Sequence, residues 1–202
     1  MKPVGNALLF VGMLFTNGVL AENIESLTVT CTGCHGEQGV SQWSDMPTIA
    51  GIDEFTHSNA LYEFRDEARP CVESEFRHGD TSRAPTTMCA VVADFSDEQI
   101  DALAAHYAAL PFTAAGQSFD PALAEAGKAV HDKLCRRCHS DGGANPEDEA
   151  SILAGQQMDY LRRTFEEYAS GEREQLDKMR EAMDALSDED VDALLHYFAS
   201  QQ

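Results

Sequence analysis

The feature that most constrains this chain is the pattern Cys-x-x-Cys-His, which occurs twice. The first copy is Cys31-Thr32-Gly33-Cys34-His35, and Cys135-Arg136-Arg137-Cys138-His139 follows 104 residues later. In this pattern both thiols add to the vinyl groups of a c-type haem and the histidine ligates the iron. Six cysteines and seven histidines in 202 residues make two chance matches rare. We therefore predict two covalent haems; a zinc site and a redox dithiol are the alternative interpretations.

The two motifs belong to a longer internal repeat. Ile49-Ala50-Gly51 matches Leu153-Ala154-Gly155 at the same spacing of 104 residues. Near the end of each half, Phe95-Ser96-Asp97-Glu98 matches Leu186-Ser187-Asp188-Glu189 at a spacing of 91 residues. The difference predicts an insertion of 13 residues in the first half, between Ile52 and the last helix of that half.

Each half has helical signals, whereas strand signals are weak throughout. Asp120 is a predicted cap for a helix that starts at Pro121 and ends at the second motif. Ser96 and Ser187 open the closing helix of each half with capping-box spacing, and a further helix is predicted over 158–168 with a counterpart over 61–68. The predicted fold class is all-α, with two tandem cytochrome c-type domains that each wrap one covalent haem. The predicted boundaries are a signal peptide at 1–21, an N-terminal domain at 22–112 and a C-terminal domain at 113–202.

The first residues and the overall charge predict the compartment. An apolar run over 7–20 precedes Ala21, which is typical of a secretory signal cleaved after that residue; an uncleaved membrane anchor is the alternative. We therefore expect a periplasmic protein with no stable membrane insertion after cleavage. The formal net charge of −21 argues against nucleic acid as a partner. We favour general solvation, as in a saline habitat, over steering of a basic redox partner, because the acidic residues are spread along the chain.

Methionines near the end of each half are the candidates for the sixth iron ligand. Met88 lies eight residues before Ser96, and Met179 lies eight residues before Ser187. Met183 competes with Met179, but its counterpart position is Val92; each methionine could alternatively fill the core. His57 and His78 are possible ligands in the first half only. The predicted axial pairs are His35 with Met88 and His139 with Met179.

The haem motifs leave two cysteines, Cys71 and Cys89. In an oxidising compartment two cysteines outside the haem motifs predict a disulfide. Closing the loop between them contributes about 3 kcal/mol to the free energy of unfolding. Free structural thiols are the alternative. No nucleophile with a base, phosphate-binding loop or paired-carboxylate site is apparent, so we assign no catalytic residue.

These features resemble a known family. The tandem units with late methionines resemble dihaem cytochromes of the cytochrome c4 class over the whole mature chain. Segments of the second half look like the dihaem cytochrome subunit of flavocytochrome c sulfide dehydrogenase, namely residues 116–120, 131–133, 142–143, 152–156 and 197–202. The resemblance implies that Cys31, Cys34, Cys135 and Cys138 hold haem, that His35, Met88, His139 and Met179 ligate iron, and that FAD is carried only by a partner subunit.

The leading functional prediction is a periplasmic electron-transfer subunit without catalytic activity of its own. It would pair with a flavoprotein in a heterodimer, accept electrons during sulfide oxidation and pass them to a soluble acceptor. The alternative is a free cytochrome c4-type carrier to a terminal oxidase. A third hypothesis, from a different class, is a catalytic dihaem enzyme such as a thiosulfate dehydrogenase component, which requires an iron with a replaceable ligand.

Overall fold

A computed structural model describes residues 17–201 of the chain, with side chains from residue 24 onward. The predicted signal peptide at 1–21 therefore lies mostly outside the described residues. The described part is helical apart from one two-stranded antiparallel sheet, in which Glu73 pairs with Thr87. Among the described residues, none of the helices combines the length and apolar character needed to cross a lipid bilayer.

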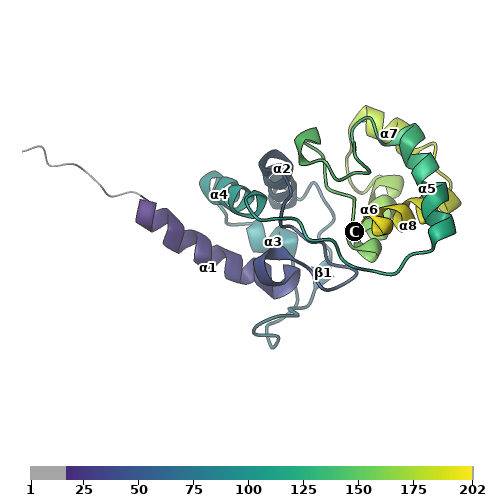
Figure 1. Cartoon of the computed structure of the whole chain (residues 1–202). Helices are drawn as coiled ribbons and strands as arrows, with labels where there is room; N and C mark the ends of the chain where they lie inside the picture. The colour runs from purple at the N-terminus through teal and green to yellow at the C-terminus, as the bar shows by residue number, and fades with distance from the viewer. Residues whose placement is uncertain (1–16, 202) are drawn as a thin grey trace, which may run out of the picture.

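The helices form two units that lie side by side, with the linker running from the end of α4 across to the start of α5 (Figure 1). The first unit contains α1 (Asn17–His35), η1 (Glu37–Gly39), α2 (Glu54–Arg65), β1 (Glu73–Ser74), β2 (Thr86–Thr87), α3 (Met88–Val92) and α4 (Asp97–Ala108). The second unit contains α5 (Pro121–Leu134), η2 (Pro146–Asp148), α6 (Met158–Ser170), α7 (Asp177–Met183) and α8 (Asp188–Ser200). The all-α prediction with two tandem units is confirmed.

Local hydrogen bonds explain where most helices begin. Asp120 accepts hydrogen bonds from the backbone N–H groups of Ala122 and Leu123, as its predicted capping role requires. Both closing helices start with a complete capping box, at Ser96 and at Ser187. Sequence patterns thus locate these helix starts because the stabilising contacts lie within three residues.

One helix prediction needs correction, and two short helices are additional. The helix expected over 61–68 runs instead from Glu54 to Arg65, because Asp53 accepts a hydrogen bond from Thr56 N and caps it earlier. The short helices α3 and α7 were not predicted. Since α2 and α6 start 104 residues apart while α3 and α7 end 91 residues apart, the insertion lies between α2 and α3 and contains β1 and β2.

Backbone hydrogen bonds repeat at the same spacing as the motifs. Gly39 O accepts from the N–H groups of Ile49 and Ala50, and Gly143 O accepts from those of Leu153 and Ala154. These equivalent bonds close the same turn after each haem motif, so the repeat seen in the sequence is also a repeat in structure.

Each unit has its own apolar core. Leu103 and Tyr107 of α4 are buried in the first, and Leu194 and Phe198 of α8 are buried in the second. In the second unit α5 crosses α8 closely at Gly127, where an added Cβ would lie 2.0 Å from the Ala193 carbonyl oxygen. A side chain at that position would push the two helices apart.

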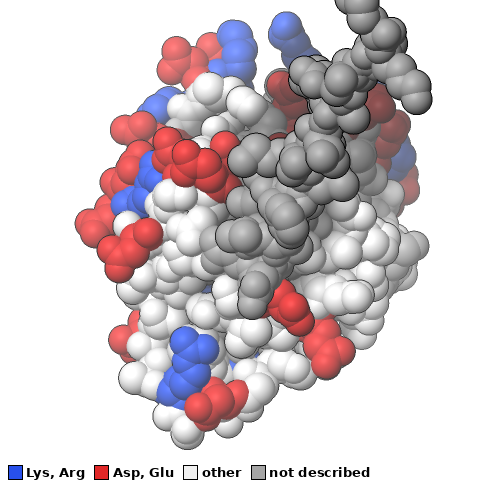
Figure 2. Space-filling model, turned by 90° about the vertical axis from the view of Figure 1, so that its left-hand side faces the viewer, with Lys and Arg blue, Asp and Glu red and all other residues white. Residues whose placement is uncertain are grey.

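The surface reflects the acidic composition. Figure 2 shows one face of the molecule, on which acidic side chains gather toward the upper edge with basic side chains among them. Much of the lower part of this face is uncharged. Charges of both signs are therefore mixed on this face.

Candidate haem-binding sites

The first motif lies at the end of α1. Residues three and four apart share one side of a helix, so the helical turn brings Cys31, Cys34 and His35 together. Neither cysteine is in a disulfide. Burial raises the pKa of both thiols, which therefore stay protonated near neutral pH. Two unpaired thiols next to an imidazole fit the attachment of a covalent haem.

His35 is oriented as a metal ligand. Its side chain is buried, and Nδ1 lies 2.9 Å from the Pro47 carbonyl oxygen. Because a carbonyl only accepts, Nδ1 carries the proton and Nε2 keeps its lone pair. Burial lowers the pKa of His35, against a smaller rise from the Pro47 carbonyl, so the ring is neutral.

The second motif follows α5 in a helical turn. Cys135 O accepts hydrogen bonds from Cys138 N at 3.1 Å and His139 N at 3.0 Å. Burial raises the pKa of Cys135 to about 11, whereas Cys138 is exposed. The buried His131 places Nε2 2.9 Å from the His139 carbonyl oxygen and fastens the end of the motif to α5. No sequence pattern singled out His131 for this role.

His139 occupies the position equivalent to His35. Burial lowers its pKa, and the Ser151 carbonyl acts in the opposite direction. Ser151 stands 104 residues after Pro47, so both imidazoles have a carbonyl from the same turn beside them. His139 Nδ1 nevertheless forms no hydrogen bond of good geometry in this structure. The fit to a metal-ligating imidazole is therefore closer in the first unit than in the second.

The two predicted methionine ligands differ in their packing. Met88 is the first residue of α3 and packs against the same core cluster as Cys31. Met179 lies in α7 and is half-buried, as is its competitor Met183. Neither packs against the second core cluster in the way that Cys135 does. The structure thus brings Met88 and Cys31 to one cluster but does not choose between Met179 and Met183.

Cys71 and Cys89 are joined by a disulfide, with their Cα atoms 5.6 Å apart. The bond ties the start of the insertion to α3, directly after Met88.

The two histidines considered as alternative ligands lie in different surroundings. His57 is buried near His35, where burial and the nearby imidazole lower its pKa to about 4, whereas His78 faces Glu37 at 3.6 Å on the surface.

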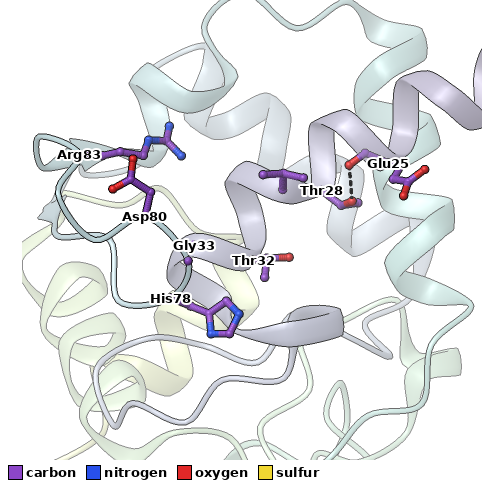
Figure 3. Close-up of a pocket in the computed structure, with 9 residues that line it drawn as sticks. Glu25, Thr28, Thr32, Gly33, His78, Asp80 and Arg83 are labelled. Atoms are coloured by element: carbon purple, nitrogen blue, oxygen red, sulfur yellow. Dashed lines mark hydrogen bonds between the residues drawn. The ribbon is translucent and has the colours of Figure 1, made fainter.

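The insertion folds over the first motif. Arg77 N and His78 N donate to the Gly33 carbonyl oxygen at 2.8 and 3.1 Å, and the Phe76 ring leaves no room for a side chain at Gly33. A hollow of about 300 Å³ remains between this loop and α1. Figure 3 shows Thr32 and Gly33 on the helix with His78 beside them. The second motif has no such cover, because its unit lacks the insertion.

The residues present fit two covalent haems. Each unit supplies two unpaired thiols and an imidazole of lowered pKa next to a backbone carbonyl, and this imidazole is buried in the first unit and half-buried in the second. No group of three or more His, Cys, Asp or Glu side chains within the described part of the chain is placed to hold a metal ion, so a zinc site finds no ligand set there. The fold and the two motifs together are those expected of a tandem c-type cytochrome.

Comparison with known proteins shows which cytochromes the chain is similar to in sequence. Residues 122–198 match the family model described as cytochrome C oxidase, cbb3-type, subunit III. The chain is 29% identical to the thiosulfate dehydrogenase electron acceptor of Stutzerimonas stutzeri (strain A1501), over 85% of this chain and 79% of that protein. It is 27% identical to cytochrome c4 of Thiocapsa roseopersicina, over 83% of this chain and 84% of that one. The chain is therefore cytochrome c4-like in sequence.

Two solved structures have a fold similar to that of this chain. Reduced recombinant cytochrome c4 from Pseudomonas stutzeri superposes with a TM-score of 0.72 at 23% identity, covering 90% of this chain and 98% of that one. Thiosulfate dehydrogenase from Marichromatium purpuratum gives a TM-score of 0.67 at 23% identity, covering 85% of this chain but 36% of that one. The cytochrome c4 part of the predicted resemblance is thus supported.

Proposed function

We propose that this chain is a periplasmic dihaem electron-transfer protein. In this proposal Cys31 and Cys34 hold one haem and Cys135 and Cys138 hold the other. The observation that carries it is the equivalent placement of both motifs, each at the end of a helix and each with its histidine beside a carbonyl of the same turn. The predicted axial pairs are His35 with Met88 and His139 with Met179.

Each haem, when bound, supplies a one-electron redox couple whose potential depends on its axial ligands and its burial. The chain provides the thiols that anchor the group and the apolar residues that exclude water from it. The Pro47 carbonyl holds His35 in the tautomer that leaves Nε2 free. Histidine and methionine together as iron ligands would favour electron transfer over ligand binding.

The electron donor in this proposal is an oxidoreductase that acts on an inorganic sulfur compound. Thiosulfate dehydrogenase is the favoured donor, because a relative that aligns over 85% of this chain is named as an electron acceptor of that enzyme. A FAD-containing sulfide dehydrogenase subunit is the second candidate, supported by the segments of the second half quoted above, including 152–156. A third possibility concerns the chain itself, which would act as a free electron carrier of cytochrome c4 type without a dedicated donor; the cytochrome c4 relatives support it.

Two measurements test the proposal. Haem content per chain, from alkaline pyridine absorbance together with the intact mass, should equal two, and one haem or none would overturn the dihaem assignment. The oxidised protein is then mixed with thiosulfate and thiosulfate dehydrogenase, or with sulfide and a sulfide dehydrogenase flavoprotein, and haem reduction is followed by stopped flow. Rapid reduction in the first mixture alone supports the favoured donor; equal and slow reduction in both would support a free carrier.

A further inference from the structure

Two buried arginines occupy equivalent positions in the two units. Arg69 is 7% exposed and Arg173 is 8% exposed, and they stand 104 residues apart, like the haem motifs. Each guanidinium stacks on an aromatic ring that also recurs at this spacing. The Arg69 guanidinium carbon lies 4.5 Å from the centre of the Phe64 ring, and that of Arg173 lies 4.5 Å from the centre of the Tyr168 ring. The repeat therefore preserves a buried cation as well as a haem motif.

The charges of both arginines act on a tyrosine at the boundary between the units. Tyr160 of α6 is at this boundary, since its N–H donates to Ser44 O of the first unit at 2.9 Å. Burial raises the pKa of the Tyr160 hydroxyl, but Arg69 and Arg173 both act on it and lower it below its ordinary value. Arginines from two different units thus converge near one tyrosine.

The described protein groups leave these two cations poorly compensated. Arg69 Nε is buried without a hydrogen bond, and the nearest carboxylate oxygen, on Glu63, is 3.6 Å away. Among the described residues no carboxylate lies within 4.0 Å of Arg173. The nearby Glu167 instead pairs with Arg163 at 3.5 Å. A buried cation with a distant carboxylate, as at Arg69, or with none, as at Arg173, is costly, although this chain carries 35 acidic residues that could have supplied a closer one.

The location of Arg69 and Arg173 indicates which anions compensate their charges. The Arg69 carbonyl lies 3.7 and 3.9 Å from the sulfur atoms of Cys71 and Cys89, and Cys89 follows the predicted ligand Met88. Arg173 precedes Met179 by six residues. The Phe64 ring under Arg69 packs against the core cluster that Cys31 and Met88 also contact. Tyr160, on which both arginines act, packs against the cluster that Cys135 contacts. Packing therefore connects the pair to both predicted haem sites, and each haem carries two propionate carboxylates. The motif arginines Arg136 and Arg137 are exposed and do not compete for this role.

We propose that Arg69 and Arg173, together with the nearby Tyr160, form a carboxylate-binding site at the boundary of the units that holds the haem propionates, one arginine for each haem. The inference rests on the proposed function, because haem is its ligand. Arginine suits this role, since its planar fork binds carboxylates in bidentate fashion and stacks on aromatic rings. The cations keep the propionates ionised and stabilise the reduced irons, so they raise both reduction potentials.

The test compares Arg69→Gln and Arg173→Gln with Arg162→Gln in the full-length haem protein. Arg162 is on α6, its side chain is 42% exposed and it pairs with Asp192 at 2.9 Å, so its substitution removes the same charge from outside the site. Each Gln variant at the site should lower the potential of the haem in its own unit. The expected change is at least threefold in the equilibrium between oxidised and reduced haem, or about 28 mV at 59 mV per tenfold change. Arg162→Gln should leave both potentials unchanged, and Arg69→Lys, which keeps the charge, should restore most of the loss.

Haem content is measured first on every variant. Wild-type protein with fewer than two haems contradicts the proposed function, whereas two haems with unchanged potentials in both Gln variants overturn the carboxylate site alone. Unmodified protein gives a second test should a variant not fold. Its potentials should not respond to added phosphate or chloride, because the propionates already occupy the site. A potential that changes with either ion would mean that the arginines bind a free anion, and would overturn the proposal.

Discussion

The side chain of Gln156 binds both backbone groups of Thr48, although 108 residues separate them in the chain. Thr48 N donates to Gln156 Oε1 at 2.9 Å, and Gln156 Nε2 donates to Thr48 O at 2.9 Å. Both residues are buried, with 2% and 1% exposure. Next to this pair, Gln157 Nε2 donates to Ser41 O at 2.9 Å. Two adjacent glutamines therefore join the second unit to the turn that follows the first haem motif.

Substitution of Gln156 by leucine should uncouple the units. The change keeps the volume similar but leaves the Thr48 N–H and carbonyl buried without partners, which should lower the free energy of unfolding by about 2–4 kcal/mol. Denaturant titration of the haem protein should show one transition in wild type and two in the variant. The matched change Gln42→Leu, at an exposed position nearby, should shift stability by less than about 0.5 kcal/mol. A single transition of unchanged midpoint in Gln156→Leu would contradict the assigned role of this contact.

Removal of the Cys71–Cys89 disulfide should weaken the first unit selectively. The bond joins residues 18 apart, and closing a loop of this size restricts the unfolded chain by about 3 kcal/mol. In the Gln156→Leu background, where the units are expected to unfold separately, Cys71→Ser with Cys89→Ser should therefore lower the midpoint of unfolding in the first unit and leave the second unchanged. Dithiothreitol should produce the same loss in Gln156→Leu itself and none in the variant that also lacks both cysteines. Equal sensitivity of both proteins to the reductant would mean that another bond is responsible.

Acid should weaken the attachment of the insertion to the first motif. The Asp45 carboxylate accepts two hydrogen bonds from the Arg77 guanidinium, and these bonds hold the pKa of Asp45 below its ordinary value. A lowered folded-state pKa stabilises the protein above the unfolded pKa of about 3.9, and the contribution disappears as pH falls through the folded value. Because both side chains are partly exposed, we expect a contribution of about 1 kcal/mol.

The measurement is the difference in unfolding free energy between wild type and Asp45→Asn, taken at pH 6 and again near pH 3. The difference should be present at pH 6 and should shrink at the lower pH. Asp66→Asn, at an exposed carboxylate 3.9 Å from its arginine, serves as the control and should show little effect at either pH. A difference that grows on acidification would contradict the sign of the argument.

The features that were predictable from sequence depend on neighbours in the chain. Ser96 and Ser187 signalled helix starts because their capping partners lie three residues away, and the haem motifs are likewise local. The contacts of Gln156 and the burial of Arg69 were not predictable. In the sequence both look like ordinary surface residues, because their partners come from distant segments. Asp53 was a missed signal, since its capping hydrogen bond to Thr56 is local and sets the true start of α2.

Substitution of each methionine of α7 should identify the one that ligates the second iron. Met179 is favoured because it repeats the spacing of Met88, but both it and Met183 are half-buried in the structure. Leucine has a similar volume to methionine, so Met179→Leu and Met183→Leu should each cost less than about 1.5 kcal/mol of stability. Loss of a sulfur ligand should lower the potential of the second haem by on the order of 100 mV, within the range of about 0.8 V that axial ligands span. It should also let the reduced iron bind carbon monoxide. Both effects are expected for Met179→Leu and neither for Met183→Leu, as measured by redox titration and by carbon monoxide difference spectra; the reverse result would assign the ligand to Met183 and show that the repeat does not extend to this position.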